Sequence, residues 1–233
     1  MRIFTGVALA AALAGGAVAQ GHDYTFDYAY PPEAARIAPL RAWLEKDKAK
    51  MRASIAEQAA EGREEARKNG YPFHEYEASK KWQVVTSTPR FLSLSGEVYS
   101  FTGGAHGSPG TVALLWDKAA QRRISSVAVF VSAAALQAAI GPAYCAKLDA
   151  ERLKRRGEPT KPGDPFGECP KLGELTVLLG SSNRLKIDRI GLIADPYVAG
   201  PYAEGSYEVT LPVTPAVLGA VKPAYRATFA LGH

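Results

Sequence analysis

The stretch FLSLSGEVY, Phe91–Tyr99, decides the fold class, because apolar residues alternate along it with small or polar ones. Such alternation is typical of a β-strand with one buried face. Trp82–Val85 before it and Thr111–Trp116 after it have the same strand-forming character. The glycine-dense segment Phe101–Gly110 lies between the last two stretches and predicts a hairpin or loop. We therefore expect a β-sheet of neighbouring strands in the middle of the chain.

The sequence before these strands has a helical pattern. Pro31 and Pro32 predict a helix start, because proline is tolerated in a first helical turn. Asn69 and Gly70 predict its end. We interpret His22–Tyr30, ahead of this helix, as a short aromatic and polar lead-in. Between the two ends, apolar residues recur at helical spacing, which favours core packing over the alternative of a partner-binding face: Ile37, Leu40, Leu44, Met51 and Ile55.

The second half of the chain again passes from helix to strand. Ser132 predicts an N-cap for a helix to about Ile140, and Gly141-Pro142 predicts a break before a second helix to about Arg156. Three further stretches favour strands and a fourth favours a short helix: Leu175–Leu179, Leu185–Ala194, Tyr207–Leu211 and Pro215–Ala220. This order of elements predicts an α+β fold with a long N-terminal helix, a mainly antiparallel sheet and a second helical segment.

The chain has two cysteines, Cys145 and Cys169. In an exported protein such an even pair predicts a disulfide, with two free thiols as the alternative. The bond would close a loop of about 24 residues and stabilise the fold by roughly 3 kcal/mol. Because Gly157–Pro170 is rich in proline, glycine and charge, we expect the bond to staple this segment to the second helical segment.

Residues 1–19 have the features of a cleavable signal peptide. Arg2 precedes an apolar run, and Ala17 and Ala19 fit the A-x-A cleavage pattern. The run is roughly a dozen residues long, whereas a membrane span needs about 20, so a retained anchor is kept only as the alternative. The uncharged segment Ile124–Ala146 is better explained by a buried strand followed by a helix than by a span. Residues 20–233 are therefore expected to form one α+β envelope domain, periplasmic or secreted and without a membrane span.

Composition and motifs exclude several function classes. The formal net charge is +5, and the basic residues alternate with acidic ones, which favours a solvated surface over a nucleic-acid partner. The short cluster Lys154-Arg155-Arg156 is interpreted as a helix end, where cations suit the helix dipole. The four histidines lack the spacing of a zinc-binding helix, and no Walker A loop or Rossmann fingerprint is present. We expect neither a metal nor a cofactor.

Two segments together resemble a known family of exported domains. They are Tyr99–Gly107, which reads YSFTGGAHG, and Pro196–Gly205, which reads PYVAGPYAEG. They resemble the paired domains of unknown function in the lysozyme-sensing anti-sigma factor RsiV and in the non-catalytic part of the peptidoglycan deacetylase PdaC. The resemblance implies a PdaC-like part over residues 22–130, an RsiV-like part over residues 131–225, and an exported α+β domain. The anti-sigma and deacetylase activities are not expected here.

The motif residues are the candidate binding site. Gly103, Gly104 and His106 would frame a pocket for a glycan or peptide, since glycine permits close approach and positive φ angles. Tyr197 and Tyr202 would stack on sugars. The alternative for the glycines and His106 is a tight bend, and for the two tyrosines it is packing beside turns.

Three functions remain open from the sequence. The first is a non-enzymatic envelope protein that binds peptidoglycan, another cell-wall glycan or a lysozyme-like protein. The second is a hydrolase in which His106 works with Ser108 or Glu204, which requires these side chains within hydrogen-bond reach. The third is a purely structural or accessory envelope protein. The surroundings of His106 are expected to discriminate between them.

Overall fold

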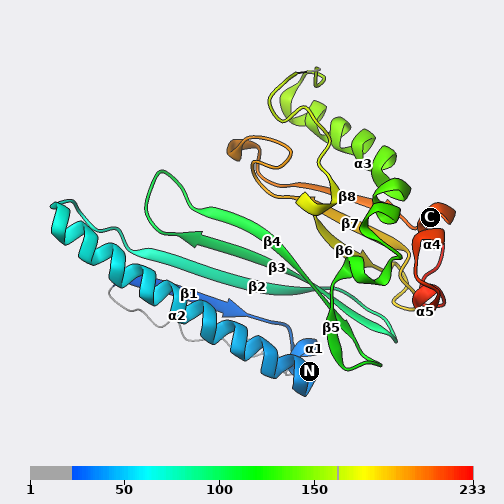
Figure 1. Cartoon of the computed structure of the whole chain (residues 1–233), viewed down its shortest axis with the longest axis horizontal. Helices are drawn as coiled ribbons and strands as arrows, with labels where there is room; N and C mark the ends of the chain where they lie inside the picture. Colours follow the sequence, from blue (N-terminus) through cyan, green and yellow to red (C-terminus); the bar gives the residue numbers. More distant parts are fainter. Residues whose placement is uncertain (1–22, 162, 233) are drawn as a thin grey trace, which may run out of the picture.

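The computed structural model describes residues 23–161 and 163–232. The predicted signal peptide lies outside these residues. Two sheets and two long helices make up the described part of the chain (Figure 1). The α+β class, the long N-terminal helix and the mainly antiparallel pairing are confirmed. None of the helices in the described ranges has the length and apolarity to cross a bilayer.

The first sheet has five strands in sequential order. They are β1 (Tyr24–Ala29), β2 (Tyr76–Ser87), β3 (Phe91–Phe101), β4 (Ser108–Asp117) and β5 (Arg122–Ile124). β1 pairs with β2 in parallel, and the other neighbours are antiparallel. The interpretation of residues 22–30 as a lead-in is wrong, because most of that stretch is β1. Its signal was the alternation of Tyr24, Phe26 and Tyr28, of which the last two are buried.

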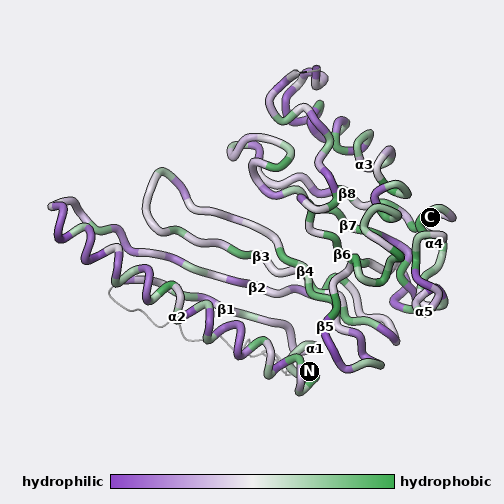
Figure 2. The backbone as a smooth tube through the Cα atoms, viewed as in Figure 1, coloured by the Kyte–Doolittle hydropathy of each residue, from purple (hydrophilic) through white to green (hydrophobic). Residues whose placement is uncertain are grey.

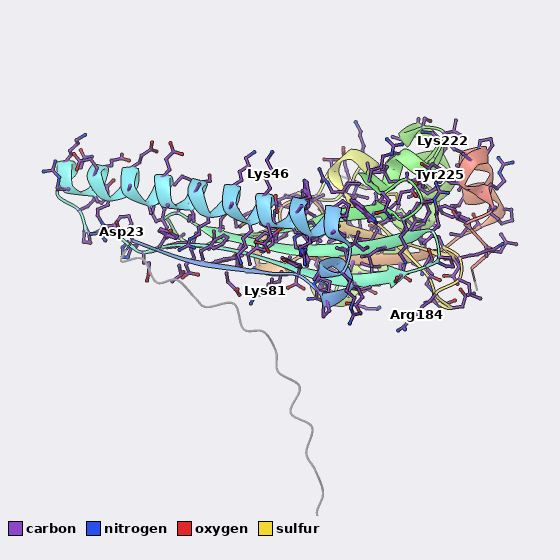
Figure 3. The ribbon with its side chains drawn as sticks, turned by 90° about the horizontal axis from the view of Figure 1, so that it is seen from below. Asp23, Lys46, Lys81, Arg184, Lys222 and Tyr225 are labelled. Carbon is purple, nitrogen blue, oxygen red and sulfur yellow. A yellow bond between two sulfur atoms is a disulfide. The ribbon has the colours of Figure 1, made fainter. Side chains whose placement is uncertain are left out.

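The predicted N-terminal helix is two helices, α1 (Pro32–Ala35) and α2 (Ala38–Asn69). Ile37 between them is extended, and Pro39 lies in the first turn of α2, where its missing N–H costs nothing. Gly70 ends α2 in a left-handed conformation (φ 72°), as expected from Asn69-Gly70. α2 lies along one face of the first sheet (Figure 3). The predicted apolar stripe packs on the core there: Leu40, Leu44 and Ile55 are buried, and Ile37 and Met51 are partly buried.

The second sheet is antiparallel, in the order β6 (Thr176–Gly180), β7 (Arg189–Ala194) and β8 (Tyr207–Pro212). α3 (Ala133–Arg156) packs against it, and the short helices α4 (Pro215–Ala220) and α5 (Pro223–Arg226) follow. Three short 3₁₀ helices, η1 (Ser126–Val129), η2 (Leu172–Glu174) and η3 (Tyr202–Glu204), lie in the connections. The expected strand from Leu185 begins only at Arg189, and the expected buried strand after Ile124 is η1.

The predicted helix break at Gly141-Pro142 is wrong. α3 runs through Pro142, and the Ser132 hydroxyl caps it by accepting a hydrogen bond from the Ala135 N–H (3.0 Å). Leu136, Ile140, Tyr144 and Leu148, each four residues apart, are all buried. A single continuous stripe therefore packs across the proline, and burial of these side chains offsets the one backbone hydrogen bond that proline removes.

The two helices cover two separate cores, which meet at the start of β3. Phe91 belongs to the core under α3, whereas Leu92 and Leu94 belong to the core under α2. On β4, Leu115 points to the first of these cores and its neighbours Leu114 and Trp116 to the second. This end of the hairpin is buried on both faces, and the apolar colouring in Figure 2 is concentrated there. The opposite end, toward Phe101 and Ser108, is more polar and more exposed.

Candidate functional site

The structure brings together His106, Tyr197 and Tyr202, which lie in two distant loops. The His106 ring stacks on Tyr202, with centroids 3.8 Å apart and an interplanar angle of 19°. The Tyr197 hydroxyl lies 3.2 Å from His106 Nε2. Phe166 extends the group, with its ring centroid 6.5 Å from that of Tyr197. We call these four residues the aromatic cluster. Three of its members are predicted by the sequence, and Phe166 is not.

The loop between β3 and β4 holds His106 in place. Gly107, the next residue, is buried under the Tyr99 ring, and a Cβ at position 107 would overlap that ring. The Gly107 carbonyl oxygen lies 2.9 Å from His106 Nδ1. Gly107 is therefore in the motif because Tyr99 of β3 approaches the backbone closely, which only glycine allows.

The second motif is the loop between β7 and β8. Tyr197 has a φ of +72°, which is rare for any residue except glycine. Hydrogen bonds hold this conformation: the Tyr197 N–H donates to the Gly200 carbonyl (2.9 Å), and the Val198 N–H donates to that of Asp195 (3.0 Å). A Cβ at Gly200 would overlap the Glu204 carboxylate. The loop is thus tightly packed around a strained, exposed tyrosine.

Arginines of α3 clamp this loop from behind. Arg152 is fully buried and donates to the carbonyl oxygens of Ala199 (3.0 Å), Glu168 (2.9 Å) and Gly167 (3.2 Å). Arg156 donates to both carboxylate oxygens of Glu204 (2.9 and 3.0 Å). The interpretation of the cluster at the end of α3 as a charged helix end is therefore incomplete, because Arg156 pairs with the loop across the fold.

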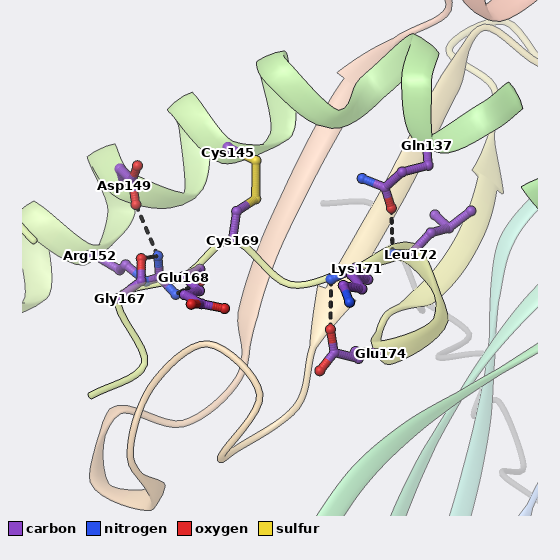
Figure 4. Close-up of a disulfide and its surroundings, with 10 residues drawn as sticks. All are labelled: Gln137, Cys145, Asp149, Arg152, Gly167, Glu168, Cys169, Lys171, Leu172 and Glu174. Atoms are coloured by element: carbon purple, nitrogen blue, oxygen red, sulfur yellow. Dashed lines mark hydrogen bonds and ion pairs between the residues drawn. A yellow bond between two sulfur atoms is a disulfide. The ribbon is translucent and has the colours of Figure 1, made fainter. Parts of the chain in front are cut away.

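The disulfide between Cys145 and Cys169 is confirmed (Figure 4). It joins α3 to the loop that follows it, one residue beyond the Glu168 carbonyl that Arg152 holds. Phe166 lies in this same loop. The bond and Arg152 together fix the segment that brings Phe166 to Tyr197.

Gly103 and Gly104 are not part of the aromatic cluster. Both have positive φ angles (92° and 97°) and turn the chain at the tip of the β3–β4 hairpin. They line a separate pocket of about 460 Å³ with residues at the end of α2 and the start of β2, among them Tyr71, Phe73 and His74. The sequence therefore grouped into one site two features that the fold places in different surroundings.

A polar groove also runs between the two sheets, and sequence reasoning missed it. Its volume is about 370 Å³, and it is lined by Tyr99 of the first motif and by Ser206, the residue after the second motif. Lys81, Glu97 and Glu208 add charged groups. Strand alternation could have indicated that Lys81 and Glu97 share a face, since they are opposite each other in the β2–β3 register. The position of β8 depends on tertiary packing.

The geometry does not assemble the predicted hydrolase residues. Among the described residues, no hydrogen bond joins His106 to Ser108 or Glu204, and its side-chain partners are the Gly107 carbonyl and the Tyr197 hydroxyl. Glu204 instead binds Arg156, whose hydrogen bond lowers the pKa of this carboxyl below its usual value. Its other partner is the Tyr207 hydroxyl. No group of three or more potential metal ligands is found within the described ranges.

Comparison with known families gives a match to the N-terminal part of the chain. Residues 19–109 match the family model described as deacetylase PdaC. This segment of the chain is PdaC-like. The PdaC-like segment contains α2, the first three strands and the motif with His106. The predicted resemblance to a PdaC-type domain of unknown function is confirmed. The deacetylase activity in that description is a property of the protein PdaC.

Two solved structures are similar to larger parts of the chain. One is a DUF3298 family protein from Pseudomonas aeruginosa PAO1, with 23% identity, a TM-score of 0.40, and coverage of 64% of this chain and 63% of that one. This chain thus spans less than two thirds of the Pseudomonas protein. The other is a DUF3298 family member from Bacteroides fragilis, with 17% identity, a TM-score of 0.44, and coverage of 82% and 72%. No curated protein matches. The RsiV-like part and the domain boundaries stay predictions.

Proposed function

We propose that this protein is exported to the cell envelope and binds a cell-wall glycan, without catalysis, through the aromatic cluster. The PdaC-like match supports an accessory domain and does not specify its role. The proposal of a glycan rests on the surface chemistry described above. The signal-like N-terminus supports export.

The observation that carries the proposal is the conformation of Tyr197. Tyr197 is 55% exposed, although burial of its aromatic ring would be favourable. Its backbone is in the left-handed region, which is strained for a residue with a Cβ. Strained and exposed aromatic residues that packing holds in place are characteristic of binding sites. Structural stability alone would favour glycine or asparagine here.

A glycan fits the chemistry of this surface. Flat apolar ring faces are presented by Tyr197, by His106 and Tyr202 in their stack, and by Phe166. The polar groove offers hydroxyl groups from Ser79, Thr111 and Ser206, together with carboxylates, for hydrogen bonds to sugar hydroxyls. Small-molecule sites combine apolar and aromatic walls with a small number of polar groups that fix the orientation of the ligand.

Sedimentation with purified insoluble peptidoglycan tests the proposal, with the protein corresponding to residues 20–233. We expect Tyr197→Asn to weaken retention by about 10-fold or more, because it removes the exposed ring. The same change suits the positive φ, so the melting temperature should stay equal or rise. Tyr202→Ala should also weaken retention, since it removes the stack under His106.

Leu185→Ala is the matched control, because Leu185 is 66% exposed and lies in a different loop. Its retention should equal that of the unchanged protein. Failure of the unchanged protein to sediment, or equal loss in all three variants, would contradict glycan binding. A parallel pull-down with immobilised lysozyme examines the alternative partner, and retention there alone would replace the glycan by a protein ligand. Export is tested by N-terminal sequencing, which should find Gln20 as the first residue.

A further inference from the structure

β5 covers only part of the outer edge of β4. β4 has ten residues, but β5 pairs only with Leu115, Trp116 and Asp117. The β3–β4 register is regular throughout, and the Lys118 N–H continues it by donating to the Arg90 carbonyl. Backbone N–H and carbonyl groups alternate sides along a strand. Those of Pro109, Thr111 and Ala113 therefore point away from β3. None of the strands that the structure describes pairs with this edge before Leu115.

Two of these three edge positions are protected. Pro109 has no N–H to offer, which is why proline is tolerated in an edge strand. Both outward backbone groups of Thr111 are hydrogen-bonded to side chains in or next to the second sheet. Its N–H donates to Asp195 Oδ2 (2.9 Å), and its carbonyl oxygen accepts from Thr176 Oγ1 (2.7 Å). Such protection is how native sheets prevent unwanted strand pairing.

Ala113 is the unprotected position. A continuation of the β4–β5 register would place Ser126 opposite it, but the chain turns there into η1. In the part of the chain that the structure describes, no hydrogen bond reaches the outward N–H or carbonyl of Ala113. Ala113 is also exposed. One donor and one acceptor of the same residue, both on the outer side of the strand, are left free.

A cavity of about 540 Å³ lies at this position. Its lining comes from β4, β5, η1 and β6, with Ile124, Val127 and Val177 as apolar walls and Arg123 as a charged one. Ser126 also lines it; this residue is 5% exposed, and its Oγ has no hydrogen-bond partner. Ala113 lines the same cavity, so its free backbone groups point to a polar occupant.

We propose that this cavity binds a short extended peptide, which pairs with Ala113 as an added β-strand. A peptide backbone supplies both a donor and an acceptor at the spacing that Ala113 presents. The available edge, from the occupied Thr111 to the β5-paired Leu115, is four residue steps, or about 13 Å. The site therefore accepts about three residues. Its apolar walls favour small apolar side chains. This site is separate from the aromatic cluster and goes beyond glycan binding.

Titration of ¹⁵N-labelled protein with the capped peptide acetyl-Val-Ala-Val-amide tests the proposal. We expect saturable shifts of the Ala113 and Ser126 amide signals, and none at Tyr197. A peptide with an N-methyl group on its central residue should bind at least about 5-fold more weakly, because it lacks the paired N–H. Absence of a shift at Ala113, or equal binding of the methylated peptide, would overturn the proposal.

Ala113→Pro is the decisive variant. It removes the outward N–H without removing a β3–β4 hydrogen bond, so the fold should persist while peptide binding is lost. Val112→Pro is its register control and should unfold the hairpin, because the Val112 N–H faces β3. Peptide binding by folded Ala113→Pro equal to that of the unchanged protein contradicts the site. If Ala113→Pro does not fold, the N-methylated peptide decides, since its binding as tight as that of the unmodified peptide contradicts the site.

Discussion

Gly107 and Tyr197 show how single residues of the two motifs act on backbone geometry. Gly107 is needed because the Tyr99 ring lies directly against its Cα. Tyr197 has the opposite character, since it keeps a side chain where the backbone would suit glycine. Packing explains the first residue without any ligand. Tyr197 contacts His106, Phe166 and Tyr202, yet it stays exposed on a strained backbone, and this supports the proposed binding role.

We expect Gly107→Ala to destabilise the fold by about 1–3 kcal/mol, because the new Cβ must displace the Tyr99 ring. Urea unfolding measures this change, and the aromatic cluster should loosen with it. Gly219→Ala is the matched control: Gly219 lies within α4 with no neighbour near a new Cβ, and alanine favours helices. Equal stability of the Gly107→Ala variant and the unchanged protein would show that Tyr99 yields freely.

At the scale of elements, α3 supports the loops that carry Phe166 and Tyr197. Arg152 is a buried guanidinium whose hydrogen bonds go mainly to carbonyl oxygens of those loops. Its acidic partner Asp149 is mostly exposed, with 57% of its side chain accessible. The role of Arg152 is therefore to satisfy backbone groups that would otherwise be buried without partners.

Replacement of Arg152 by methionine keeps the apolar stem and removes every one of these hydrogen bonds. We expect a loss of about 3 kcal/mol or more, with faster amide exchange in the loop around Tyr197. Hydrogen exchange followed by mass spectrometry measures both effects. Lys154→Met, at a position two residues away with a side chain 69% exposed, should leave exchange unchanged. Equal exchange in the two variants would argue against the clamp.

At the scale of the whole molecule, the two cores are joined near the β3–β4 end that both helices cover. Arg90 donates to Asp117 Oδ2 (2.8 Å) and lies over the Tyr225 ring of α5, 5.5 Å from its centroid. Burial raises the pKa of Asp117, but the Arg90 hydrogen bond and the N–H groups of Ala119 and Ala120 outweigh burial and lower it overall. The carboxylate thus holds Arg90, which connects the first sheet to α5.

This lowered pKa predicts acid-sensitive stability. Because the folded pKa of Asp117 lies below its unfolded value near 3.8, its contribution is complete above that value and is lost as the pH falls toward the folded pKa. We expect Asp117→Asn to cost about 1–3 kcal/mol at pH 7 and less at pH 3. Urea unfolding at both pH values measures this difference. Asp27→Asn, which breaks an exposed ion pair with Lys81, should cost under about 1 kcal/mol. A penalty for Asp117→Asn that is independent of pH would contradict the assignment.

The sequence by itself determined the features that depend on local chemistry. The strand alternation around Phe91, the helix end at Gly70, the Ser132 cap and the pairing of the two cysteines all follow from short-range pattern or from parity. The two motifs also indicated that His106, Tyr197 and Tyr202 belong together. Residues 22–30 were misinterpreted because a single short strand is stabilised only by its partners, here β2 and α2.

Tertiary structure alone decided what depends on burial between distant segments. Pro142 predicts a helix break locally, and the buried stripe from Leu136 to Leu148 overrides it. Gly103 and Gly104 are adjacent to His106 in sequence, yet the turn at the hairpin tip sends them to another pocket. The open edge at Ala113 exists because β5 ends where η1 begins, two residues after Ile124. Local sequence specifies backbone preference, and only long-range packing determines which surfaces remain free.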